Sequence, residues 1–406
     1  MGIYKWLYPG MRIKRWMVLC SIGIVLCSMG FVVTLIENQE ASGSLFVVAG
    51  IFLVVLSIRK IMKSVIMILA PNQEGQILNK MYQRGVLSSG PRIVAVGGGT
   101  GLSVLLRGLK ERTTNITAVV TVSDDGGSSG RLRSQFDVLP PGDIRNCLSA
   151  LADAEPMMQE LLQFRFSEKS SDLAGHSFGN LFILAMAKIT GDFEKAVRES
   201  SRILNIRGQV VPSTLSKVVL EARHADGKVL EGETKISAYA SPIERLFLKP
   251  DDSPATDDAI AAIRTADAIV LGPGSLYTSV LPNLLIKEIL QEIARVRVPK
   301  IYVCNIMTQP HETAHLKSDI DHVRALVEHT RPEVITHCIV NNGAVPGELA
   351  QRYTGGGSVP LECRAEEIRQ MGYTVFETDL VQGSDVVRHN SRKLSKLIVE
   401  IAQSKK

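Results

Sequence analysis

Residues 121–132, TVSDDGGSSGRL, place two adjacent aspartates in a stretch rich in glycine and serine. Paired carboxylates are typical of divalent-metal or acid–base chemistry. The backbone N–H groups of a glycine–serine loop, followed by Arg131, instead form a cradle for an anion. A plain chain turn is a third interpretation of the same residues. Residue types alone leave these three roles open.

Small and polar residues also follow four other predicted strands. Carboxyl ends of parallel strands meet along one edge of a sheet, where ligands bind in open α/β folds. Five such ends on one rim predict a ligand cleft. HSFGN, at 176–180, opens a predicted helix and either caps it or faces this cleft. The residues that we expect to bind the ligand are Gly98, Gly99, Thr100, Gly101, Asp124, Asp125, Ser128, Arg131, Asn180, Gly274, Ser275 and Asn305.

The turn at 97–101, GGGTG, lies between a strand and a helix and predicts an anion site, because free N–H groups and the helix dipole face the ligand. It is not the G-x-G-x-x-G fingerprint, since Leu102 takes the third glycine's place, and no Lys-Ser/Thr follows as in an ATPase loop. GPGS at 272–275 repeats the pattern, so a diphosphate-containing ligand could span both turns. The glycines could instead serve tight strand–helix packing alone.

HETAH, at 311–315, matches the H-E-x-x-H pair of zinc proteases. It directly follows Thr308-Gln309-Pro310, which is typical of a helix start, so we expect it in the first turn of a helix near 313–329. A zinc pair needs a position well inside a helix and a third ligand downstream. We therefore interpret the segment as capping and surface residues.

Apolar strands alternate with helices from Arg92 onward. This predicts an α/β fold with a doubly wound, mostly parallel, Rossmann-like sheet. We expect the sheet to form a single nucleotide-binding domain at 92–406. Residues from about 142 to 250 contain several predicted helices and an antiparallel hairpin that turns at Asp226-Gly227. We expect this part as an insertion on the sheet.

Two apolar runs without charge, at 17–36 and 41–58, precede that domain. Each is about long enough to cross a ~30 Å hydrocarbon core. Basic residues flank both outer ends and none lies in the connecting loop, so the positive-inside rule predicts a transmembrane helical hairpin over 1–70 with both ends cytoplasmic. A polar linker at 71–91 follows. The expected location is the cell membrane, with two spans and a cytoplasmic main domain.

The composition argues against several classes of binding partner and site. The net charge is +5, only 5% of residues are aromatic, and no basic stripe interleaved with aromatics is present, which argues against a nucleic-acid partner. The six cysteines form no C-x-x-C pair, so they predict neither a zinc knuckle nor a disulfide framework and suit a reducing compartment.

Seven blocks in order carry a family resemblance: VAVGGGTGLSVLLRGLK, TVSDDGGSSGRLR, PPGDIRNCL, HSFGNL, GPGSLYTSVLPNLL, CNIMTQP and VRHN. From about residue 92 to 401 the chain resembles the YvcK/CofD-like family of gluconeogenesis factors. The resemblance implies a regulator that binds UDP-N-acetylglucosamine and is linked to gluconeogenic growth, cell shape and cell-wall precursor supply. It also implies glucosamine-6-phosphate synthase as a partner. The chain departs from the family pattern at His311, where glycine is common, and at Asn390, where aspartate is.

The family is related to 2-phospho-L-lactate transferase, which implies an alternative. In that transferase branch a nucleotide-activated substrate is used with Mg²⁺, and Asp124 and Asp125 match aspartates near the acceptor and metal. We favour the non-catalytic regulator, because no nucleophile–base pair stands out in the sequence. No cofactor is then required, the nucleotide sugar is the ligand, and we expect a homo-oligomer.

Overall fold

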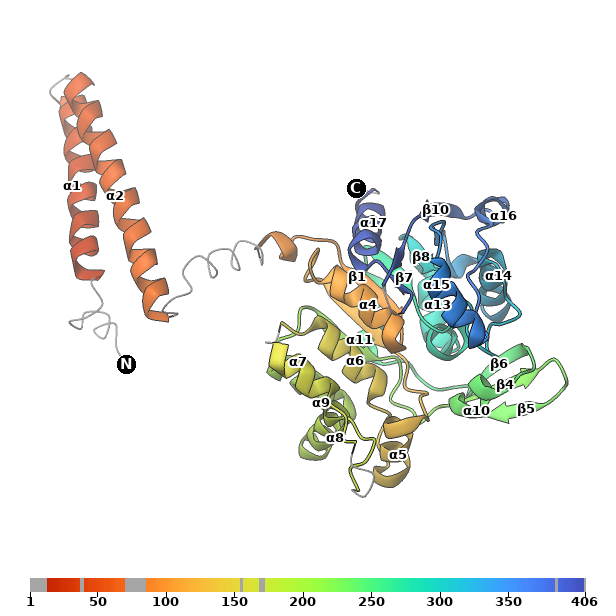
Figure 1. Cartoon of the computed structure of the whole chain (residues 1–406). Coiled ribbons are helices and arrows are strands. Elements are labelled where there is room, and N and C mark those ends of the chain that lie inside the picture. The colour runs from red at the N-terminus through yellow and green to blue at the C-terminus, as the bar shows by residue number, and fades with distance from the viewer. Residues whose placement is uncertain are drawn as a thin grey trace. The chain divides into compact units, whose positions relative to one another are not determined.

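The computed structural model describes residues 13–36, 40–69, 85–153, 156–167, 172–383 and 386–404. The chain divides into two compact units, Met1–Val86 and Leu87–Lys406 (Figure 1). Most of the predicted linker lies outside the described residues, and its last five residues, 87–91, belong to the second unit.

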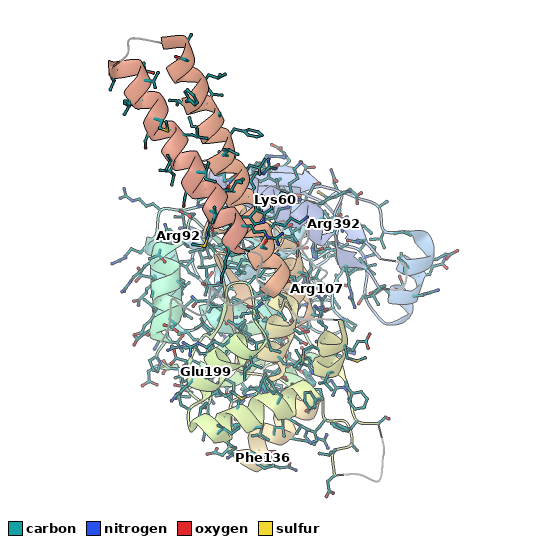
Figure 2. All side chains as sticks on the ribbon, turned by 90° about the vertical axis from the view of Figure 1, so that its left-hand side faces the viewer. Lys60, Arg92, Arg107, Phe136, Glu199 and Arg392 are labelled. Atoms are coloured by element: carbon teal, nitrogen blue, oxygen red, sulfur yellow. The ribbon has the colours of Figure 1, made fainter. Side chains whose placement is uncertain are left out.

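The first unit is a pair of helices, α1 (Ile13–Ile36) and α2 (Glu40–Leu69). Glycines form the seam between them: a Cβ on Gly50 would lie 2.6 Å from the Gly23 carbonyl oxygen, and one on Gly30 would lie 2.7 Å from the Gly43 carbonyl oxygen. Such small residues allow close helix packing of the kind found in membranes. Figure 2 shows the apolar side chains that both helices direct outward.

Both helices confirm the two predicted apolar segments. Each contains a stretch that is long and apolar enough to cross a membrane, 14–35 in α1 and 41–64 in α2. Large apolar side chains are exposed along both, such as Phe31 at 65% and Phe52 at 63%. Contiguous exposed apolar surface of this kind marks a contact with a membrane or with another protein.

The second unit is built on a seven-stranded sheet whose paired strands are all parallel. The spatial order is β10-β9-β8-β7-β1-β2-β3, so the winding direction reverses between β1 and β7. This confirms the predicted α/β, doubly wound, Rossmann-like fold. The strands are β1 (Ile93–Gly97), β2 (Ile116–Val120), β3 (Gln209–Pro212), β7 (Ala268–Leu271), β8 (Lys300–Val303), β9 (His337–Asn341) and β10 (Thr374–Thr378).

Helices cover both faces of this sheet, because alternate strand residues point to opposite sides. Ile93 and Ala95 belong to one core cluster, whereas Val94 and Val96 belong to the other. The first cluster is closed by α4 (Gly99–Leu109), α6 (Gly142–Leu151) and α17 (Ser391–Gln403). The second is closed by α11 (Asp257–Thr265), α12 (Leu281–Leu284), α13 (Lys287–Arg295), α14 (Asp319–His329) and α16 (Ala365–Gln370).

The predicted insertion at 142–250 divides into two parts. Helices α6, α7 (Pro156–Gln163), α8 (Phe178–Thr190) and α9 (Phe193–Ile203) connect β2 to β3, which is the edge strand of the main sheet. The rest forms a three-stranded antiparallel sheet, rather than a single hairpin, from β4 (Val219–His224), β5 (Val229–Glu231) and β6 (Ile243–Lys249). Residues 219–249, with α10 (Glu233–Ala238), are called the arm; Figure 1 shows it at the edge of the unit.

Three local predictions differ from the structure. The glycine–serine stretch after the two aspartates is the start of a helix, α5 (Gly127–Phe136), which buries Leu132. The helix expected near 313–329 begins at Asp319, where Ser318 and Asp321 form a capping box. HETAH therefore lies in turns before α14, and its histidines do not share a helix face.

The remaining elements are short. They are η2 (Leu276–Val280), which continues into α12, η3 (Pro332–Val334), α15 (Gly347–Gly355), and the antiparallel pair β11 (Val381–Gln382) and β12 (Arg388–His389).

Candidate functional site

The two glycine turns meet where the sheet reverses direction. Gly97–Gly101 follows β1 and 272–275 follows β7, and these strands are neighbours. A Cβ on Gly101 would lie 2.5 Å from the Pro273 carbonyl oxygen, so glycine is needed for the turns to touch. Gly99 has a φ of 66°, which also favours glycine. The reversal point is the usual ligand crevice of such sheets.

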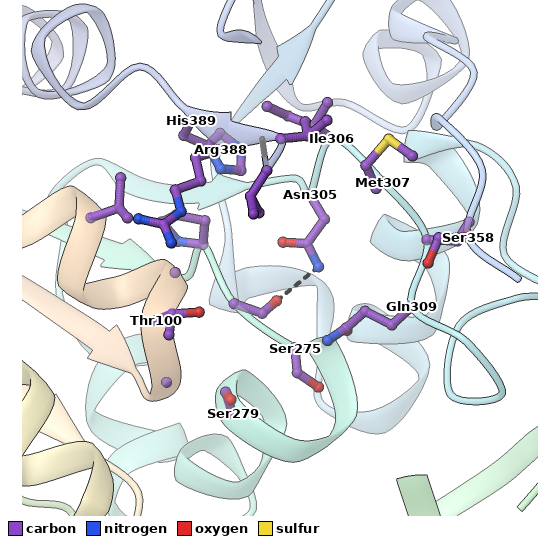
Figure 3. A pocket seen from close by; sticks show the side chains of 18 of the residues that line it. Thr100, Ser275, Ser279, Asn305, Ile306, Met307, Gln309, Ser358, Arg388 and His389 are labelled. Atoms are coloured by element: carbon purple, nitrogen blue, oxygen red, sulfur yellow. Dashed lines mark hydrogen bonds between the residues drawn. The ribbon is translucent and has the colours of Figure 1, made fainter. Parts of the chain in front are cut away.

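A cavity of about 520 Å³ opens at this point. Its size is that of a small-molecule site. Figure 3 shows Asn305 between Arg388 and Ser275, with Thr100 and Gln309 around it. The cavity is lined by Gly98, Gly99, Thr100, Gly101, Val104, Glu233, Pro273, Gly274, Ser275, Thr278, Ser279, Asn305, Ile306, Met307, Thr308, Gln309, Pro310, Tyr353, Ser358, Val386, Val387, Arg388 and His389.

Backbone donors at the start of α4 face this cavity. The first N–H groups of a helix have no acceptor within the helix. Gly99 N–H donates to the Asp143 carboxylate. Thr100 and Gly101 also line the cavity, where their N–H groups and the helix dipole favour an anion.

The opposite wall contributes a cation and a neutral histidine. Arg388 lines the cavity, and its charge adds to burial in lowering the pKa of Arg107 on α4. His389 Nε2 lies 3.0 Å from the Cys304 carbonyl oxygen, which can only accept, so this nitrogen carries the proton. Burial lowers the pKa of His389 to about 4 and keeps it neutral. The sequence analysis missed both residues, although VRHN was one of the resembling blocks.

Three carboxyl groups adjoin the first turn. Burial raises the pKa of Asp124. Burial, and then the charge of Asp124, raise the pKa of Asp143 to about 7. Burial, and then Asp124 and Asp143, raise the pKa of Glu233 to about 9. Within the described residues no three such side chains are close enough to hold a metal ion by themselves. A cation here would need ligand phosphate oxygens to complete its shell.

The two predicted aspartates have different surroundings. Asp124 Oδ1 accepts from the Gly126 N–H at 2.8 Å, and the side chain stays beside Asp143. Asp125 Oδ1 instead accepts from Thr234 N at 2.9 Å and from Thr234 Oγ1 at 2.7 Å. Asp125 therefore anchors the arm at the start of α10.

Three further predicted residues lie outside the cavity lining and bind one another or nearby backbone. Ser128 Oγ lies 2.9 Å from His176 Nδ1 and accepts from Asn180 Nδ2 at 3.0 Å. Arg131 donates to the Ala174 carbonyl oxygen at 2.5 Å. The hydrogen bonds of Ser128 with His176 and Asn180 are buried and join α5 to the start of α8.

The second turn is filled by the HETAH segment. The Glu312 carboxylate accepts from Ser275 Oγ and from Tyr277 N at 3.1 Å, while Thr278 N donates to Ser275 Oγ at 3.2 Å. The Ser275 hydroxyl proton, expected to serve a ligand, is thus committed to Glu312. Asn305 Nδ2 donates to the Gly274 carbonyl oxygen at 2.8 Å. The side-chain carbonyl of Asn305 is then left to face the cavity.

The chain is similar to one known protein family and to several proteins within it. The profile of the family described as 2-phospho-L-lactate transferase CofD matches residues 93–381. A Clostridium acetobutylicum protein named "Putative gluconeogenesis factor" is 41% identical over 100% of this chain and 93% of its own length. The "Gluconeogenesis factor" of Bacillus subtilis is 48% identical over 77% of this chain and 98% of its own.

Solved structures share the fold. A crystal structure of a UPF0052 family member from Bacillus halodurans has a TM-score of 0.74 and 41% sequence identity. The match covers 77% of this chain and 99% of that chain. The Clostridium protein is thus similar throughout this chain, whereas the two Bacillus proteins are similar over about three quarters of it.

Proposed function

Because this chain belongs to the CofD family, among relatives named gluconeogenesis factors, we propose that it is a nucleotide-sugar-binding regulator at the cytoplasmic face of the membrane. The proposed ligand is UDP-N-acetylglucosamine. The relatives' name supports a link to gluconeogenic growth. The proposal extends to cell shape and cell-wall precursor supply, through glucosamine-6-phosphate synthase as the partner.

The cavity at the sheet reversal is the observation that carries this proposal. Thr100 and Gly101 supply N–H donors, and Arg388 supplies a guanidinium, which together suit a diphosphate. Ile306 and Met307 supply apolar surface for a base or sugar ring. Among the described residues that line the cavity, no hydroxyl is hydrogen-bonded to a histidine, which is the usual means of activating a nucleophile. Binding without turnover fits this arrangement.

Calorimetric titration of the full-length chain with UDP-N-acetylglucosamine, with and without Mg²⁺, tests the proposal. The ligand is followed by NMR in the same samples. We expect binding and an unchanged ligand. Absence of binding in both conditions would contradict the regulator.

A Mg²⁺-dependent transferase is the second candidate, favoured by the carboxyl groups of Asp124, Asp143 and Glu233 near the first turn. In that case phosphate oxygens and these carboxylates would share the ion. Turnover of a nucleotide-activated substrate that requires Mg²⁺, and that Asp143→Asn abolishes, would support this candidate over the regulator.

Membrane attachment through α1 and α2 is part of the proposal. Lys14, Arg15, Arg59 and Lys63 lie toward the outer ends of the two segments, and the link at 37–40 carries no basic residue. The positive-inside rule then puts both outer ends in the cytoplasm. Leu87–Lys406 follows the second segment and would lie on the same side.

A further inference from the structure

The Glu312 carboxyl group occupies the second glycine turn, where burial raises its pKa and the hydrogen bonds from Ser275 and Tyr277 oppose that rise. The Glu312 side chain is only 4% exposed, although it comes from a segment of turns. Its partners Ser275 and Tyr277 stand at the start of η2, which continues into α12 as one helical stretch. The carboxylate therefore meets the positive end of that stretch.

The two glycine turns consequently differ in what they offer a ligand. In the first, Gly99 N–H goes to Asp143, and Thr100 and Gly101 still face the cavity. In the second, the Ser275 hydroxyl and the Tyr277 N–H are directed at Glu312, and the Thr278 N–H donates to Ser275 Oγ. The Ser275 oxygen in turn accepts from Thr278 Oγ1 at 2.6 Å. A ligand phosphate at the second turn would compete with a buried carboxylate of the same charge.

Glu312 also pins the loop that forms one wall of the cavity. Residues 305–310 line the cavity. Gln309 N donates to Thr313 Oγ1 at 2.8 Å, and Thr313 N returns a bond to the Gln309 carbonyl at 3.1 Å. His311, with a φ of 61°, makes the turn between them. The carboxylate thus holds this loop against the β7 turn.

We propose that Glu312 is a positioning residue and specificity determinant: it fixes the wall at 305–310 and closes the second turn to phosphate, so that ligand phosphates bind at the first turn and Arg388. This deepens the proposed nucleotide-sugar function and rests on it only for the identity of the ligand. It replaces the expectation that a diphosphate spans both turns.

Chemical rescue by formate tests the role of the Glu312 carboxyl group without any nucleotide. In full-length Glu312→Ala, the Ser275 hydroxyl and the Tyr277 N–H lose their acceptor, and a formate ion fits in place of the missing carboxylate. Sodium formate should raise the thermal midpoint of this variant above its value in sodium chloride of equal ionic strength. The wild type and Glu312→Gln, whose side chains fill the turn, should show no such difference. Equal midpoints of Glu312→Ala in the two salts would overturn the proposal.

Titration with UDP-N-acetylglucosamine tests positioning. In chloride, Glu312→Ala should bind about tenfold more weakly or worse, the effect of losing a charge-assisted hydrogen bond, and formate should restore affinity. Undiminished affinity in chloride would overturn the proposal. If the wild type does not bind this ligand, the proposed function fails while the formate test still decides the role of Glu312.

Glu312→Gln keeps the experiment decisive should Glu312→Ala not fold. The amide fills the turn but lacks the charge, so we expect affinity about tenfold below wild type and no recovery in formate. Wild-type affinity in Glu312→Gln would overturn the proposal.

Discussion

At the scale of the residue, the adjacent aspartates Asp124 and Asp125 have separate roles. Asp124 stays beside Asp143 near the first turn, whereas Asp125 holds Thr234 at the start of α10. Successive residues in an extended stretch point to opposite sides, so neighbours in sequence reach different partners.

Substitution by asparagine should change the stability of the protein differently at Asp124 and at Asp125. Asp125→Asn weakens two hydrogen bonds to the arm, so we expect its free energy of unfolding to fall by about 1 kcal/mol. Asp124→Asn removes a buried charge that its neighbours repel, so we expect no loss of stability. Urea unfolding of both variants measures this, and equal destabilisation would show that the roles are not separate.

The carboxyl groups beside the first turn make stability depend on pH. The pKa of Glu233 is about 9 in the folded chain against 4.5 ordinarily, and that of Asp143 is about 7 against 3.8. The folded state therefore keeps protons that the unfolded state releases, and the free energy of unfolding falls as pH rises through this window. Glu233→Gln should thus gain stability relative to wild type between about pH 5 and pH 9. A constant difference in urea unfolding across that range would contradict the assignment.

Arg388 is the cation that we expect to meet ligand phosphate. Arg388→Ala should weaken UDP-N-acetylglucosamine binding by about tenfold or more, the value of a charge-assisted hydrogen bond. Arg392→Ala is the matched control, since Arg392 is also exposed but lies on α17 outside the cavity lining. Calorimetry measures both, and equal losses would indicate a general charge effect instead.

At the scale of the element, the helical pair α1–α2 depends on its glycine seam. Gly50→Leu puts a side chain where even a Cβ would lie 2.6 Å from the Gly23 carbonyl oxygen. The two helix axes should move apart by about 2 Å, because interhelical distances vary over about that range with the size of the side chains at the contact. Spin labels at Phe31 and Phe46, on an otherwise cysteine-free full-length chain, report this by pulsed EPR.

Ile51→Leu is the control for that experiment, because Ile51 points outward and is 54% exposed. Its label distance should match that of the parent chain. A Gly50→Leu distance equal to the control would show that the seam does not determine the packing.

At the scale of the whole molecule, we expect membrane attachment and ligand binding to belong to different units. Deleting residues 1–70 should move the protein from the membrane to the soluble fraction, because it removes both long apolar helices. Ligand affinity should stay within about twofold, since the cavity lies within Leu87–Lys406. A full-length chain that is already soluble, or a deletion that stays in the membrane fraction, would contradict this division.

Sequence alone determined the features that depend on order along the chain. Alternating strands and helices led to the doubly wound sheet, two uncharged runs led to α1 and α2, and glycines after strands led to the turns that line the cavity. These signals are local, so each can be interpreted without knowing what lies across from it. The α5 helix escaped because its glycine–serine start has low helix propensity, and burial of Leu132 outweighs that propensity.

Only the tertiary structure decided which side chains meet. Glu312 reaches Ser275 across 37 residues, and Asp125 reaches Thr234 across 109. Nothing in the spacing of HETAH or of the two aspartates encodes those partners, because side-chain pairing depends on which loops the sheet order brings together. The sequence thus located the edge of the sheet where the cavity lies, while packing assigned one aspartate to the arm, one glutamate to the second turn, and Arg388 to the cavity.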